Sequence, residues 1–183
     1  MFRAIVSGYH NLADVTAVLV ITQKWSDMIR NGLKTMELRS CSMRKYEGQW
    51  VGFAVSGCHA IWGAGRISKS TLLDEQSMFT PNLLLQHCVT PEDLSHLRAA
   101  LTAKGAREKP WKKIYGLSLH GVVTFPQPVR YHHPCGAIGL VRLVGNEVFE
   151  RARAVALARP MPRDVLSRRR AGTLRPVVQR RRK

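Results

Sequence analysis

Hydrophobic and polar positions alternate between residues 17 and 40 in patterns typical of a strand, a helix and a second strand. The apolar, β-branched run over 17–22 predicts a strand, and apolar side chains spaced three and four apart predict a helix over 23–31. Between 34 and 40, Met36 and Leu38 alternate with polar residues, which is the period of two expected of a strand. This part of the chain is therefore expected to form a β-α-β arrangement.

The pattern further along predicts more strands than helices. We expect four more strands, over residues 49–56, 60–67, 114–125 and 138–144. A short turn at Gly57 joins the first two of them as a hairpin, and Pro126 and Pro128 are expected to end the third.

Two further helices are expected among the remaining residues. Residues 70–90 are predicted to be irregular, and Thr90 followed by a proline opens a helix. Residues 146–158 form another helical segment. This order of elements predicts an α+β protein, a small mixed or antiparallel β-barrel flanked by two or three helices and followed by a basic C-terminal extension.

A length of 183 residues corresponds to about one domain with an appendage. We expect a leader over 1–16, either disordered or a short first strand, and a barrel domain over 17–144. A helical extension over 145–158 and an arginine-rich disordered tail over 159–183 follow.

The charge is unusual and unevenly distributed. The chain has 29 Lys and Arg against 12 Asp and Glu, a net charge of +17, and residues 151–183 alone hold 12 basic and one acidic side chain. Such an excess indicates a polyanionic partner, that is, a nucleic acid. The tail would contact phosphates without reading sequence, through the clusters Arg168, Arg169, Arg170, Arg180, Arg181 and Arg182. The alternatives for these arginines are a solubilising tail and a nuclear address.

A second basic segment, over 109–113, interleaves an aromatic ring with cations. Trp111 could stack on a base while Lys109, Lys112 and Lys113 hold phosphates. The alternative is that Trp111 packs into the end of the barrel and the lysines keep the loop soluble.

The four cysteines lie at wide, irregular intervals, which indicates an intracellular, reducing setting, the cytoplasm or nucleus. An acid-poor start leaves the mitochondrial matrix as an alternative. No apolar run reaches the length of a membrane span. We expect no cofactor and no metal, because the pair Cys58 and His59 is about seventy positions from the group His132, His133 and Cys135.

The segment after the first helix holds the candidate chemistry. Glu37 could accept a hydrogen bond from an exocyclic base amine, and Arg39 on the same face could hold that carboxylate or bind phosphate. Lys34, just past a glycine turn, could meet a phosphate or, if desolvated, act as a base or nucleophile. Thr35 lies on the same predicted face. The alternative is an exposed ion pair on a solvated strand, which would contribute about 0–1 kcal/mol.

The motif Gly32-x-Lys34-Thr35-x-Glu37-x-Arg39 after a tryptophan-containing helix resembles the signature of the ASCH domain, a relative of the PUA fold. The resemblance covers about residues 17–144 and includes Gly48-x-Trp50 and the later Pro134-x-Gly136-x-Ile138-Gly139. It implies a small PUA-like pseudo-barrel with a cleft that accepts nucleic acid, RNA rather than DNA, and it places Lys34, Glu37 and Arg39 in that cleft.

Some members of this family are enzymes, either amidohydrolases that remove the acetyl group of acetylated cytidine or ribonucleases. The amidohydrolase type has a lysine, a threonine and a later acid. Here Glu37 occupies the threonine position, and the later acid could only be Asp74 or Glu75. An enclosed Lys34 with a second acid in reach would favour the enzyme.

Three hypotheses follow. The first is an RNA-binding protein with a base site around Lys34, Thr35, Glu37 and Arg39; the second is a hydrolase in which Lys34 and Glu37 are catalytic. The third is a structural component of a ribonucleoprotein particle. The oligomeric state stays open.

Overall fold

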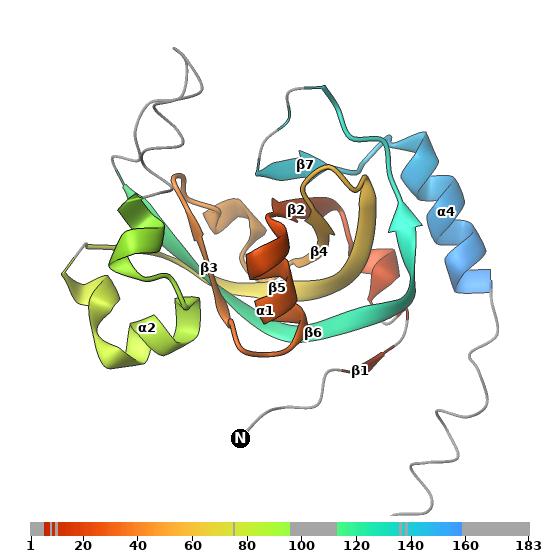
Figure 1. Ribbon diagram of the computed structural model, residues 1–183. Helices are drawn as coiled ribbons and strands as arrows, with labels where there is room; N and C mark the ends of the chain where they lie inside the picture. Colours follow the sequence, from red (N-terminus) through yellow and green to blue (C-terminus); the bar gives the residue numbers. More distant parts are fainter. Residues whose placement is uncertain are drawn as a thin grey trace, which may run out of the picture.

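The structure is a computed structural model in which residues 6–7, 9, 11–74, 76–95, 113–135, 137 and 139–158 are described (Figure 1). None of the described helices is long and apolar enough to cross a membrane.

The described strands form one mixed sheet that curls into a half-barrel. They are β1 (Val6–Ser7), β2 (Ala17–Ile21), β3 (Met36–Arg39), β4 (Trp50–Val55), β5 (Ala60–Leu73), β6 (Ile114–Arg130) and β7 (Leu140–Arg142). The order is β1-β6-β5-β4-β2-β7, and β3 also pairs with β6. The pairs β1–β6 and β2–β4 are parallel and the others antiparallel. The expectation of a mixed sheet with flanking helices is confirmed.

The sheet curls because its two longest strands bend together. β5 and β6 pair over almost their whole length and their register shifts at three places, and Figure 1 shows both curving around the molecule. Among the described pairings, however, β3 and β7 are edge strands that do not pair with each other. The barrel expected from the sequence is therefore an open half-barrel.

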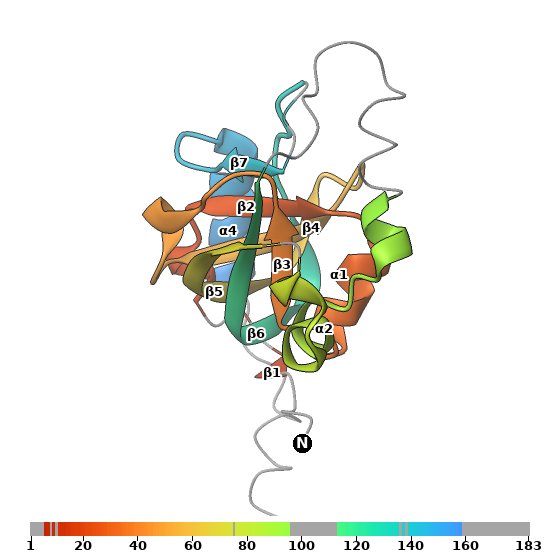
Figure 2. The same ribbon diagram turned by 90° about the vertical axis from the view of Figure 1, so that its left-hand side faces the viewer.

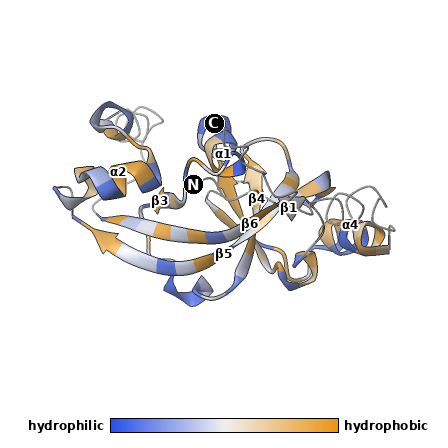
Figure 3. Cartoon of the chain, turned by 90° about the horizontal axis from the view of Figure 1, so that it is seen from below, coloured by the Kyte–Doolittle hydropathy of each residue, from blue (hydrophilic) through white to orange (hydrophobic). Residues whose placement is uncertain are grey.

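Helices cover the ends of this half-barrel. α1 (Gln23–Arg30) packs against β4 and β6 through Trp25 and Ile29, and Figure 2 shows it beside β3. α2 (Pro81–His87) contacts β3, whereas α4 (Glu147–Ala158) packs against β6 at the opposite end of the molecule (Figure 3). Asn146 caps α4, since its side-chain oxygen accepts the amide of Phe149.

Short 3-10 turns η1 (Leu12–Asp14), η2 (Arg44–Tyr46) and η3 (Ser77–Phe79) connect these elements. Residues 91–95 are helical, as expected, and Thr90 caps them by accepting the amide of Asp93.

Two predictions about elements are wrong. Residues 70–90 are not irregular, because β5 runs on to Leu73 and α2 follows it. Pro126 and Pro128 do not end β6, which continues to Arg130. The register shift that places Thr124 opposite Gly63 and Val129 opposite Ile61 leaves both prolines in a bulge, where their missing N–H groups are not needed.

Candidate functional site

Lys34 is buried because the chain turns sharply after α1. Gly32 adopts a φ of 72°, and the amides of Leu33 and Lys34 both donate to the carbonyl of Met28. This turn directs the lysine inward, where only 1% of its side chain is exposed. Its ammonium donates to the carbonyl of His87 at 2.5 Å and lies 4.9 Å from the centre of the Trp25 ring.

Glu37 joins Lys34 to Arg39 in a buried network of charges. Its Oε2 is 3.6 Å from Lys34 Nζ, and its Oε1 is 3.0 Å from Arg39 Nη2. The side chains of Glu37 and Arg39 are 8% and 13% exposed. One carboxylate therefore lies between two cations in a setting where an unpaired charge would be costly.

Arg39 connects the edge strand β3 to β2, the neighbour of the other edge strand β7. From the edge strand β3 its Nη2 donates to the carbonyl of Val20 in β2 at 3.0 Å. A side chain at Gly139, just before β7, would come within 3.3 Å of Nη1. The buried Nε has no hydrogen-bond partner among the described residues. The Nε–H is thus a donor of this guanidinium that no described residue uses.

Burial lowers the pKa of Lys34 below its ordinary value, and the neighbouring Glu37 carboxylate opposes that shift. Because desolvation is the larger effect, the amine gives up its proton more readily than a surface lysine. This is the electrostatic setting in which lysine can act as a base or nucleophile.

His87, at the end of α2, accepts the Lys34 ammonium through its carbonyl and is fully buried. The amide of Val89 donates to its Nδ1, so that nitrogen carries no proton, and Nε2 is 2.7 Å from the carbonyl of Met78. Burial lowers the pKa of this imidazole, and the nearby Lys34 lowers it further. His87 is therefore a neutral structural residue whose backbone carbonyl holds Lys34.

Of the candidate residues, the structure brings together Lys34, Glu37 and Arg39 but not Thr35. Thr35 is exposed; its carbonyl accepts the amide of Leu119, which extends the pairing of β3 with β6, and its amide donates to the carbonyl of Gln86 in α2. Glu37 and Arg39 do share a face, as the alternation predicts. That face is buried, so the alternative of an exposed ion pair on a solvated strand is wrong.

The other candidates are elsewhere or outside the described residues. Asp74 is exposed and caps η3 by accepting the amide of Ser77, and this bonding to Ser77 lowers its pKa. Lys113 is exposed just before β6. The remaining candidates lie outside the described residues: Glu75, Lys109, Trp111, Lys112, Arg168, Arg169, Arg170, Arg180, Arg181 and Arg182.

The sequence did not reveal that His87 and Trp25 enclose Lys34. The sequence did contain a signal for His87, since Thr80 followed by Pro81 is typical of a helix start and would have placed residue 87 at the end of that helix.

The two groups of histidines and cysteines that lie about seventy positions apart in sequence do meet in the structure. The rings of His59 and His133 stack with their centres 5.3 Å apart. Within the described ranges, no three His, Cys, Asp or Glu side chains are grouped to hold a metal ion.

A scan against models of protein families finds no match, and a search of curated proteins finds none. Solved structures do match. An ASCH protein from Zymomonas mobilis aligns with a TM-score of 0.51 at 15% identity, over 77% of this chain and 94% of that one. Two mutant proteins of it align over the same shares at 12% identity, with TM-scores of 0.52 and 0.54. The resemblance stated from the motif is thus confirmed at the level of the fold, and the chain has the fold of the ASCH proteins.

Proposed function

We propose that this chain is an RNA-binding protein that accepts a base with an exocyclic amine at Glu37 and Arg39. The observation that carries the proposal is the Glu37–Arg39 pair, in which the Arg39 Nε has no hydrogen-bond partner among the described residues. A carboxylate accepts the amine of cytosine, and an adjacent guanidinium N–H can donate to a ring acceptor of the same base.

Lys34 has a supporting part in this proposal. It is almost fully enclosed by His87 and Trp25 and lies on the far side of Glu37 from Arg39. Its ammonium lies 3.6 Å from Oε2 of Glu37 and so helps to hold that carboxylate in position to accept. Arg39, which links β3 to β2 and is more exposed than Lys34, is the residue nearer to an arriving base.

The excess of basic side chains would supply most of the affinity. A net charge of +17 favours any polyanion, and contacts to phosphates carry no base preference. The affinity for RNA is therefore expected to depend on the salt concentration, whereas the preference for one base over another is expected to depend on Glu37.

The test is a Glu37→Gln protein measured by fluorescence anisotropy against oligocytidylate and oligouridylate of equal length. The variant should bind both with similar affinity, whereas the unchanged protein prefers oligocytidylate. Lys69→Gln, which removes an exposed charge from β5, is the control and should keep the preference. Far-ultraviolet circular dichroism first establishes that each protein is folded. A preference that survives in folded Glu37→Gln would contradict the proposal.

A second candidate function is hydrolysis of an acetylated base amine or of RNA itself, and the lowered pKa of Lys34 favours it. In the amide reaction, the neutral amine would take a proton from water while the oxygen adds to the acetyl carbonyl. The C–N bond would then break, the proton would pass to the leaving base amine, and acetate would be released. Lys34 is enclosed, as such an enzyme would require, but Asp74, the described candidate for the second acid, is exposed and bonded to Ser77 of η3, so we place this function second.

Incubation with acetylcytidine and with RNA, followed by chromatography, tests the second function. Deacetylated cytidine or cleaved RNA that disappears with Lys34→Met would establish it. Substrates left intact over hours by the unchanged protein would exclude it.

A further inference from the structure

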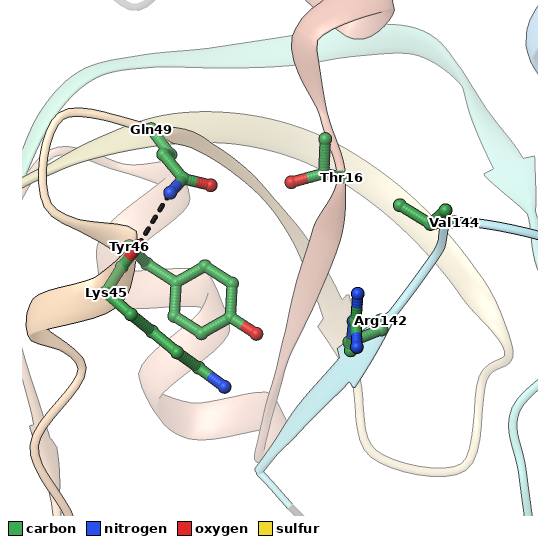
Figure 4. A pocket seen from close by; sticks show the side chains of 6 residues that line it. All are labelled: Thr16, Lys45, Tyr46, Gln49, Arg142 and Val144. Atoms are coloured by element: carbon green, nitrogen blue, oxygen red, sulfur yellow. Dashed lines mark hydrogen bonds between the residues drawn. The ribbon is translucent and has the colours of Figure 1, made fainter.

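A polar cavity lies beside the start of β2 and contains none of the side chains of the Glu37 site. It has a volume of about 330 Å³ and is lined by Thr16, Lys45, Tyr46, Gln49, Arg142 and Val144. These residues come from η2 and the loop after it, from the start of β2 and from the end of β7 (Figure 4). The cavity thus joins segments that are far apart in sequence.

The cavity is lined by hydrogen-bond donors and has no acid. Lys45 and Arg142 contribute positive charge, and Tyr46 and Thr16 contribute hydroxyl groups. Figure 4 shows the Lys45 amine and the Tyr46 hydroxyl directed toward the side of the cavity that holds Arg142. The amide nitrogen of Gln49 is already used, since it donates to the Lys45 carbonyl at 2.6 Å.

The local fold holds Lys45 in place at the rim. Its neighbours Met43 and Tyr46 are buried in the core, and the amide of Met43 donates to the Ser70 hydroxyl. Lys45 is exposed, and its ammonium lies 5.0 Å from the centre of the Tyr46 ring. The acid nearest in sequence, Glu47, accepts the amide of Ser70 at 2.7 Å.

Arg142 is exposed because side chains alternate between buried and exposed along the edge strand β7. Val141 is buried and pairs with Val18, whereas Arg142 is exposed and pairs with Ala17. β7 ends the described sheet, so no described strand lies beyond it. Two cations on separate elements therefore face one cavity together with two hydroxyl groups.

We propose that this cavity binds a phosphate group. Paired cations with neutral donors and no carboxylate are the chemistry that recognises phosphate, and a guanidinium can bind two of its oxygens at once. The phosphate could belong to an RNA strand or be free. Phosphate binding itself does not depend on the proposed function; only the assignment of the phosphate to an RNA strand rests on it.

The position of the cavity favours RNA as the source. The amide of Val20, whose carbonyl holds Arg39, donates to Gly139, and Arg142 follows three residues later along the extended chain. Three residues of extended chain span about 10 Å. A strand with a base at Glu37 could therefore place a neighbouring phosphate in this cavity.

The experiment titrates inorganic phosphate into the full chain by isothermal titration calorimetry, and measures binding of an oligocytidylate by anisotropy. Lys45→Gln and Arg142→Gln are compared with Lys69→Gln and Arg130→Gln, which remove exposed charges outside this cavity. The unchanged protein should bind phosphate with a dissociation constant of about 1 mM or lower. The first two variants should each weaken it at least about tenfold, and the two controls should not.

The outcomes separate the possibilities. If Lys45→Gln and Arg142→Gln weaken both phosphate and RNA more than the controls do, the site holds an RNA phosphate. If they weaken phosphate alone, the site holds a free phosphate. No phosphate binding at about 10 mM, or binding equally reduced by all four variants, would overturn the inference. An unchanged protein that binds phosphate but binds oligocytidylate and oligouridylate equally would count against the Glu37 site alone.

Discussion

At the residue scale, the candidate site is governed by the cost of burying charge. Lys34, Glu37 and Arg39 are compatible with burial because each charge has an opposite neighbour, at 3.6 Å and 3.0 Å. Glu37 is the shared partner, so its removal leaves two cations facing each other. Loss of Lys34 leaves Glu37 still paired with Arg39.

This difference predicts an order of stabilities. Glu37→Gln should lower the free energy of unfolding by about 3–5 kcal/mol, the usual cost of removing one partner from a buried ion pair. Lys34→Met, which fills a similar volume without a charge, should cost clearly less. Urea unfolding followed by circular dichroism measures both. An equal or larger loss for Lys34→Met would show that the amine, and not the carboxylate, holds the network together.

His87 predicts a dependence of stability on pH. Its pKa in the folded protein lies below the ordinary value of 6.5, so the unfolded chain takes up a proton first as the pH falls. Stability should therefore be fully present above pH 6.5 and decline below it, by at most about 1.4 kcal/mol per pH unit for this one proton. His87→Gln, which keeps one donor and one acceptor, should lose this part of the decline.

Urea unfolding at several pH values between neutral and mildly acidic conditions measures the effect. His120→Gln, at an exposed position of β6, is the control and should decline as the unchanged protein does. A His87→Gln protein with the same pH dependence as the unchanged one would contradict the burial argument.

At the element scale, the close approach of β5 and β6 determines the curl of the sheet. A side chain at Gly63 would overlap the carbonyl oxygen of Val123, which is backbone and fixed by the ladder. A side chain at Gly116 would instead meet the flexible end of Met36. A methyl group at residue 116 could therefore be accommodated by movement of the Met36 side chain, whereas one at residue 63 would require the backbone to move.

Gly63→Ala should accordingly cost more stability than Gly116→Ala. Overpacking costs about 1–3 kcal/mol, and we expect Gly63→Ala at or above the upper end and Gly116→Ala near the lower end. Thermal and urea unfolding of the two variants provide the comparison. The reverse order would mean that the bulge beside Gly63 shifts more easily than the Met36 side chain.

The elements also show how far the sequence could lead. Hydrophobic periodicity was sufficient for β2, α1, β3 and α4, because each buries a face through local spacing. It could not predict that β6 passes two prolines, since that depends on a bulge formed with β5. Nor could it predict that both faces of β3 are buried, because the residues that cover β3 come from α2 and from β2, which are distant in sequence.

At the scale of the whole molecule, most of the excess positive charge and the proposed base site lie in different parts of the chain. Residues 159–183 hold ten basic side chains and one acidic one, whereas Glu37 and Arg39 are in the half-barrel. Composition was enough to predict a polyanionic partner. The motif was enough to group Lys34, Glu37 and Arg39, but the cavity at Lys45 and Arg142 depends on the curl that brings η2 next to β7.

This separation predicts how a deletion behaves. Removing residues 159–183 should weaken RNA binding and flatten the dependence of affinity on salt, by about 0.7 in the logarithmic slope for each phosphate that the tail neutralises. The preference among bases should persist. Anisotropy titrations at several salt concentrations measure both quantities, and an unchanged slope would show that the tail does not bind phosphates.

The most direct test of the base site uses the unchanged protein, so that no substitution affects folding. Its dissociation constants for oligocytidylate and oligouridylate of equal length are measured at one salt concentration. The amine of cytosine is replaced in uracil by an oxygen that the Glu37 carboxylate would repel. The Glu37 and Arg39 site predicts binding of oligocytidylate about tenfold tighter or more. Equal affinity for the two strands would contradict it.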